Sequence, residues 1–168
     1  ARPHKTGVRT VDWEYTTYIV AESAADTAGN YGNKLWLSTT LLMHSGANAR
    51  VKTKDVTPVF SEHRVIAVRL ATRWTNSLSV VAHGPYLGSD DASSADWVWD
   101  VLETNVSKLR RNNDTTVFLT SANAQIRSER LDCFSHAAAV EQFVASLALT
   151  EVTTLEANLR DGDIFTSY

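Results

Sequence analysis

The chain has 168 residues, a length that fits one domain with a sizeable core. Hydrophobic residues make up 43% of it, and no apolar run reaches the roughly 18 residues that a membrane span needs. The formal net charge of −3 argues against a protein that binds nucleic acid through a basic surface. A single cysteine, Cys133, excludes an intrachain disulfide.

The first eleven residues are basic. Arg2, His4, Lys5 and Arg9 occur there, and no acidic residue precedes Asp12. We interpret residues 1–11 as a basic N-terminal extension and 12–168 as a single domain. Three origins are open for this end: an artificial boundary, a processed mature end, or the remainder of a cleaved transit peptide. A processed end would suggest an organelle, a mitochondrion or a plastid, as the compartment.

Period-two alternation and turn residues predict strands, and apolar residues at helical spacing predict two helices. The expected strands cover 15–20, 34–37, 51–60 with a break at Pro58, 65–70, 78–82, 115–120 and 152–154. A hairpin turn is expected at 75–77. The expected helices cover 95–110 and 136–148. Strands with interposed helices indicate an α/β sandwich.

The stretch 115–128 carries the chemistry of interest. Its strand ends in Ser121-Ala122-Asn123-Ala124. A metal-dependent phosphodiesterase would place a carboxylate and an amide at such a strand end, where they hold Mg²⁺ and orient a phosphate. The amide is present as Asn123, and Ser121 stands in the position of the carboxylate.

This stretch resembles the G-D-F-N-A motif of the endonuclease/exonuclease/phosphatase superfamily, in particular the endonuclease domain of non-LTR (LINE-type) retrotransposons. Segments that agree in order and spacing are 29–38, 64–70 with 78–85, and 160–167. The resemblance spans most of residues 12–168. It implies a four-layer α/β sandwich of the DNase I type that is incomplete at both ends.

The resemblance also implies a set of catalytic parts, most of which have no match. The superfamily uses an early Asn, a metal-binding Glu, the Asp and Asn of the motif, and a C-terminal Asp–His pair, which would follow Ser167. Glu14 and Glu22 lie on or beside the strand that should follow the catalytic Glu. Only Asn123 matches by position, because a neutral Ser121 cannot replace a carboxylate. We therefore expect no enzyme activity, no bound metal and no cofactor.

His83 is a third remnant candidate beside Ser121 and Asn123. It ends a predicted strand and is followed by Gly84-Pro85. One interpretation is a phosphate or metal contact, and the other is a turn histidine that hydrogen-bonds to the backbone. In either case we expect the groove near Asn123 and His83 to keep its shape.

Trp97 and Trp99 are candidates for an interface. They lie two residues apart on one predicted helix, so both cannot face the same core. An exposed tryptophan is typical of the buried centre of a protein interface. The alternative is a tryptophan that lies flat over the edge of the sheet.

Three functions fit these observations. The first, which we favour, is a catalytically inactive endonuclease-like domain that serves as a structural or interaction subunit of a larger assembly of protein subunits. The second is a fragment of an active metal-dependent phosphodiesterase. The third is a non-catalytic nucleic-acid-binding module, which the acidic balance disfavours.

Overall fold

The computed structural model describes residues 5–25, 32–42, 46–84, 92–121 and 134–149. These residues form a mixed α/β structure in which most elements are strands. The chain divides into two compact units, Ala1–Asn123 and Ala124–Tyr168. All the described strands and the longer helix belong to the first unit.

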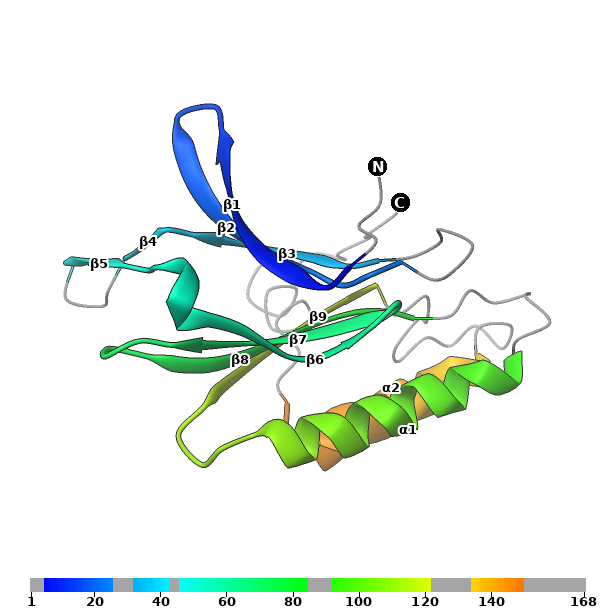
Figure 1. Cartoon of the computed structure of the whole chain (residues 1–168). Helices are drawn as coiled ribbons and strands as arrows, with labels where there is room; N and C mark the ends of the chain where they lie inside the picture. Colours follow the sequence, from blue (N-terminus) through cyan, green and yellow to red (C-terminus); the bar gives the residue numbers. More distant parts are fainter. Residues whose placement is uncertain (1–4, 26–31, 43–45, 85–91, 122–133, 150–168) are drawn as a thin grey trace, which may run out of the picture. The chain divides into compact units, whose positions relative to one another are not determined.

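The first sheet of this unit is an antiparallel meander (Figure 1). It consists of β1 (Gly7–Trp13), β2 (Thr16–Glu22) and β3 (Lys34–Ser38), in that order. Because β1 begins at Gly7, residues 7–11 belong to the sheet, and the boundary that we expected before residue 12 falls inside this strand. A small pair, β4 (Thr40–Leu42) and β5 (Asn48–Arg50), follows.

The second sheet has four strands in the order of the sequence. They are β6 (Val56–Glu62), β7 (Val65–Ala71), β8 (Asn76–His83) and β9 (Thr115–Ser121). The first three are antiparallel neighbours, whereas β9 runs parallel to β8. The helix α1 (Ala92–Leu109) makes the connection that a parallel pair requires.

A short 3-10 turn, η1 (Thr53–Asp55), interrupts the strand that the sequence predicted over 51–60. The carboxylate of Asp55 accepts the Lys52 N–H at 2.8 Å, and the Asp55 N–H donates to the Lys52 carbonyl at 2.9 Å. These bonds favour a turn over an extended backbone. The break expected at Pro58 is confirmed as a register shift between Pro58 and Phe60, because proline has no N–H to donate.

The turn between β7 and β8 lies earlier than the predicted 75–77. The hydroxyl of Thr72 accepts the N–H groups of Trp74 and Thr75 at 3.1 and 3.0 Å, and the Thr72 N–H donates to the Thr75 carbonyl at 2.9 Å. This threonine therefore closes the turn at 72–75. Asn76 and Ser77 belong to β8, where they pair with Ala71 and Leu70.

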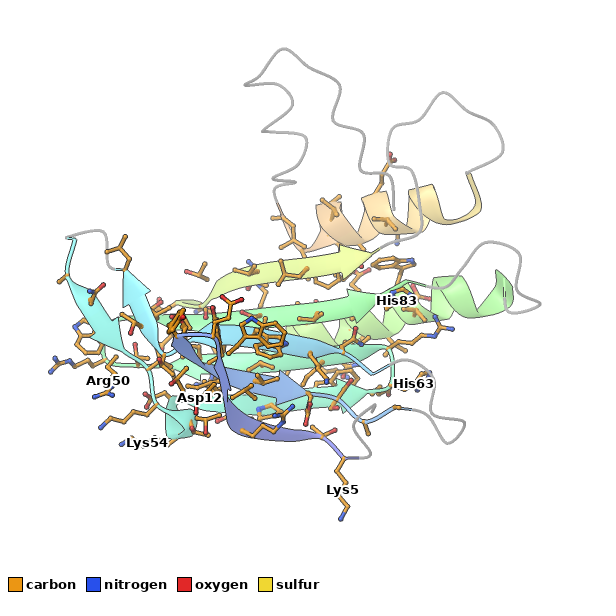
Figure 2. All side chains as sticks on the ribbon, turned by 90° about the horizontal axis from the view of Figure 1, so that it is seen from above. Lys5, Asp12, Arg50, Lys54, His63 and His83 are labelled. Carbon is orange, nitrogen blue, oxygen red and sulfur yellow. The ribbon has the colours of Figure 1, made fainter. Side chains whose placement is uncertain are left out.

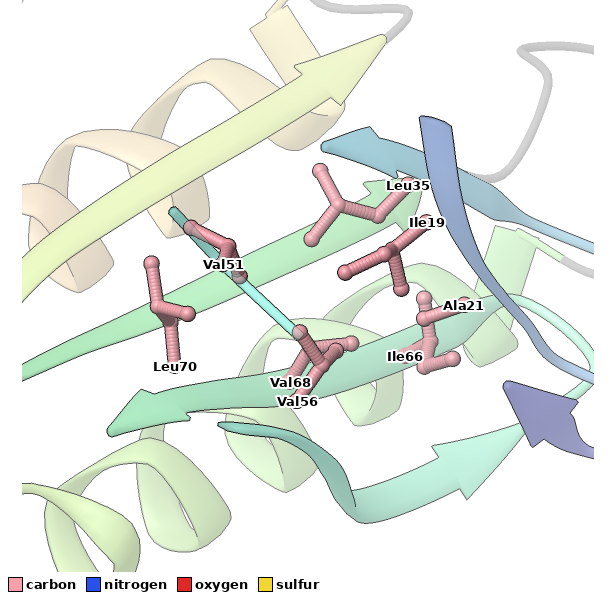
Figure 3. Packing of buried hydrophobic residues seen from close by; sticks show 8 residues of the cluster. All are labelled: Ile19, Ala21, Leu35, Val51, Val56, Ile66, Val68 and Leu70. Carbon is pink, nitrogen blue, oxygen red and sulfur yellow. The ribbon is translucent and has the colours of Figure 1, made fainter. Parts of the chain in front are cut away.

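An apolar core fills the space between the two sheets (Figure 3). Buried side chains from β2 and β3 meet alternate side chains of β7, as the period-two pattern predicted. The cluster consists of Ile19, Ala21, Leu35, Val51, Val56, Ile66, Val68 and Leu70.

The opposite face of the second sheet packs against α1. Val98, Trp99, Leu102 and Val106 of the helix are buried, and the Trp99 ring lies 6.4 Å from the Phe118 ring of β9. The predicted helix over 95–110 is thus confirmed, with an earlier start. The second unit contributes α2 (Phe134–Ser146), which confirms the second predicted helix. The strand expected at 152–154 lies outside the described residues.

Candidate functional site

His83 and Ser121 end two neighbouring strands of the second sheet. The parallel register of β8 and β9 pairs them directly. Both therefore lie at the carboxyl ends of their strands, at the same end of the sheet. Asn123, the third remnant candidate, lies outside the described residues.

His83 is half-buried and held by its backbone. Its N–H donates to the Arg64 carbonyl at 2.9 Å, which joins the end of β8 to the turn between β6 and β7. Burial lowers the pKa of His83 below its ordinary value of 6.5, and the positive charge of Arg64 lowers it further. The imidazole is therefore neutral at pH 7, which suits a hydrogen-bonding role better than a cationic one.

Polar groups of the first sheet reach the same end of the unit. The Gly32 N–H donates to the His63 carbonyl at 2.8 Å. The Ser23 N–H donates to the Asn33 carbonyl at 2.9 Å, and the Asn33 N–H donates to the Ser23 hydroxyl at 2.8 Å. Ser23 is fully buried, and Gly32 has a φ of 85°, which glycine adopts without strain. His63 and His83 lie toward the same end in Figure 2. The site is thus the end at which both sheets meet.

Two acidic residues on or beside β2, Glu22 and Glu14, lie at opposite ends of that strand. Glu22 forms ion pairs with Arg9 at 3.2 Å and Lys34 at 3.8 Å. Glu14 lies in the turn between β1 and β2, at the opposite end of β2 from Ser23. Within the described ranges, no three His, Cys, Asp or Glu side chains gather as a metal site would require.

Trp99 does not meet the expectation of an interface anchor. Only 2% of it is exposed, because it points into the layer between α1 and the second sheet and contacts Phe118. This outcome matches the alternative of a tryptophan that covers the sheet. The side chain of Trp97 lies outside the described part of the structure.

Sequence reasoning missed a buried ion pair between Arg69 of β7 and Asp114. The two side chains are only 9% and 2% exposed. Arg69 also donates to the Leu109 carbonyl at the end of α1, and the carboxylate of Asp114 accepts the Arg111 N–H at 3.1 Å. Burial would raise the pKa of Asp114, but the Arg69 and Arg111 hydrogen bonds and charges outweigh it and lower that pKa. The sequence signal that could have revealed this pair is Arg69 itself, the single charged residue in the otherwise apolar strand β7.

An aromatic cluster on the first sheet was also missed. The Trp36 ring contacts Trp13 and Tyr18 edge to face, with centroids 6.1 and 5.7 Å apart. Trp13 is 60% exposed and Trp36 42% exposed. The pairing of β1, β2 and β3 brings these rings together, and the alternation of each strand alone does not reveal it.

Comparisons of the chain with protein-family models, curated proteins and solved structures find no match. Across the described ranges, no helix combines the length and apolarity needed to cross a membrane.

Proposed function

We propose that this chain is a catalytically inactive domain of the endonuclease/exonuclease/phosphatase type, which serves as a structural or interaction subunit of a larger protein assembly. The observation that carries the proposal is the pairing of Ser121 with His83 at the carboxyl ends of β9 and β8. The resemblance requires a carboxylate at position 121. A neutral hydroxyl there supplies neither the charge that holds Mg²⁺ nor a base that activates water.

The layered arrangement of the first unit supports the DNase I-type fold that we propose for it. Two sheets enclose the core, and α1 covers the outer face of the second sheet. A DNase I-type sandwich likewise has an inner pair of sheets with helices outside. The polar contacts at Ser23, Gly32 and His63 join the sheets at the end where such a fold has its groove.

Exposed apolar side chains support the interaction role. Trp13 and Trp36 are 60% and 42% exposed, and their rings contact each other edge to face. Large exposed aromatic and aliphatic residues that lie near one another mark surfaces that associate with other proteins. Glu22 forms ion pairs with Arg9 and Lys34 beside the aromatic cluster and offsets one of these two positive charges, which weakens the attraction of this face for phosphate.

The loss of catalysis is tested by plasmid nicking with Mg²⁺ or Mn²⁺. We expect the purified chain to stay at the background of a buffer control, and the His83→Ala and Asn123→Ala variants to behave identically. Metal-dependent nicking that disappears in Asn123→Ala would contradict the proposal.

The subunit role is tested by native mass spectrometry of the protein isolated from its source. We expect a complex with other protein subunits. A chain that is isolated free of every partner, at its natural concentration, would remove the support for an interaction role whatever the nicking assay shows.

A further inference from the structure

Three connections of the second sheet meet at one end of the first unit. The register sets one row of residues across all four strands, namely Val56, Leu70, Ser77 and Thr115. This row lies where β6, β8 and β9 begin and β7 ends, so it brings η1, the turn at 72–75 and the segment 110–114 together (Figure 1). The strand ends at His83 and Ser121 lie at the opposite end of the same sheet.

Exposed lysine and arginine side chains follow these connections, and we call them the basic end. They are Arg50 at the end of β5, Lys52 and Lys54 beside and within η1, Arg73 in the turn at 72–75, Lys108 in the last turn of α1, and Arg111. Figure 2 shows Arg50 and Lys54 on the same side of the unit. Within the described ranges, none of these cations forms an ion pair with a carboxylate.

The carboxylates at this end have other partners. Asp55 accepts the Lys52 backbone N–H at 2.8 Å, and Asp114 is buried against Arg69. Asp12, which Figure 2 shows on the same side as Arg50 and Lys54, accepts the Thr17 hydroxyl at 2.7 Å. Asp12 offsets one positive charge, and the basic end keeps an excess of cations.

An exposed tryptophan lies among these cations. Trp74 is 43% exposed, and the Arg73 guanidinium lies over its ring, 4.0 Å from the centroid. The Thr72 hydroxyl accepts the Trp74 N–H at 3.1 Å and fixes the turn that presents both side chains. Cations beside an exposed ring suit single-stranded nucleic acid, because cations bind its phosphates and its bases stack on aromatic rings. An acidic peptide would use the cations but has no base to stack on the ring.

The net charge of −3 does not oppose such binding. It describes the whole chain, whereas the attraction of a ligand depends on the charge of the surface that it meets. At about 0.1 M salt, exposed charges more than about 10 Å away are largely screened. The acidic residues elsewhere in the chain therefore act weakly on a ligand at the basic end.

We propose that the basic end binds single-stranded nucleic acid, with phosphates along the three connections and a base stacked on Trp74. The row spans three strand spacings of about 4.8 Å, or about 14 Å, which is room for a strand of a few nucleotides. The inference goes beyond the proposed function, because it names a nucleic-acid partner and does not depend on the loss of catalysis. Its surface is also separate from the strand ends at His83 and Ser121.

The test is fluorescence anisotropy of labelled 15-nucleotide oligouridylate RNA and oligothymidylate DNA with the full chain, in buffer with EDTA. We expect micromolar binding of at least one strand at about 50 mM salt. With about four phosphates contacted, the affinity should fall about fiftyfold between 50 and 200 mM salt. The tighter of the two strands identifies the sugar that the surface prefers.

Charge reversal at matched exposed positions tests the location. Lys54→Glu and Arg73→Glu should each weaken binding by at least about fivefold, whereas Lys5→Glu, which Figure 2 shows away from Arg50 and Lys54, should change it less than about twofold. Trp74→Ala should weaken binding by at least about fivefold through the lost stacking. Circular dichroism checks that each variant keeps the fold.

A polyglutamate peptide of equal charge separates nucleic acid from an acidic protein segment. We expect it to bind more weakly than the oligonucleotides and to be insensitive to Trp74→Ala. Peptide binding as tight as that of both oligonucleotides overturns the choice of nucleic acid. No binding of either strand at about 100 μM chain overturns the proposal, and a loss in Lys5→Glu equal to that in Lys54→Glu overturns the location.

Discussion

The strands β7 and β9 belong to the same sheet but differ in how they are covered. Six successive residues of β7, from Val65 to Leu70, are buried, since the first sheet lies on one face and α1 on the other. In β9 only the face with Phe118 meets the helix, and Val117 and Leu119 remain exposed. The comparison separates buried side chains that hold the fold together from apolar side chains that stay exposed.

The largest expected effect on stability comes from breaking the ion pair between Arg69 and Asp114, which anchors β7 near the end of α1. Asp114→Ala leaves the Arg69 charge buried without its partner, and we expect a loss of about 3–5 kcal/mol in the free energy of unfolding. The double variant Arg69→Met/Asp114→Leu should lose less than the single one, because no charge is left stranded. Urea unfolding followed by circular dichroism measures both. A loss for Asp114→Ala no larger than for Arg73→Ala, in the exposed turn, would contradict this role.

Truncation of one apolar side chain in each strand tests the comparison directly. Ile66→Ala in β7 removes fully buried atoms and should cost about 2–5 kcal/mol. Leu119→Ala in β9 lies in the same row of the sheet but is exposed, and we expect a change within about 0.5 kcal/mol. Equal losses would show that β9 is covered as completely as β7 in solution.

The pH dependence of stability should report the same ion pair. The pKa of Asp114 is lower in the folded chain than in the unfolded chain, where it is about 3.9. Its stabilisation is therefore fully present above pH 5 and is lost as the pH falls through the folded pKa. The stability difference between wild type and Asp114→Asn should be constant from pH 7 to pH 5 and shrink below that. A difference that grows on acidification would have the wrong sign.

The smallest expected effect concerns His83. Arg64→Gln removes the positive charge that contributes to its lowered pKa, so this pKa should rise. It should still stay below 6.5, because burial is the larger cause. Titration of the His83 side-chain signals by NMR in the wild type and in Arg64→Gln measures the change. A His83 pKa that does not move in Arg64→Gln would exclude the charge of Arg64 as a cause.

Local patterns predicted the elements well where one force dominates. The alternation in 65–70 and 78–82 gave the right faces, since burial of one face determines it. The turn before β8 and the strand expected over 51–60 differ from the prediction. In each case a side chain, Thr72 or Asp55, accepts a backbone N–H and so favours a local turn over an extended backbone. Arg69 and Asp114 lie far apart in the sequence, so no local pattern could pair them.

The candidate site was predictable only in part. The strand ends at His83 and Ser121 follow from the alternation, but their adjacency depends on the parallel register across α1. The link from Gly32 to His63 joins different sheets and has no local signature. The contact of Trp99 with Phe118 also depends on how α1 is rotated against the sheet.

The parallel connection between β8 and β9 has a consequence for the order of folding. Ser77 pairs with Leu70 across a short turn, but with Thr115 only across the whole of α1. Each doubling of a closed loop costs about 0.6 kcal/mol of chain entropy, so the three antiparallel strands gain their contacts sooner. We expect β9 to join last. Until it docks, an uncharged segment rich in β-branched and aromatic residues is exposed on the nascent chain, which makes this step the one most prone to aggregation.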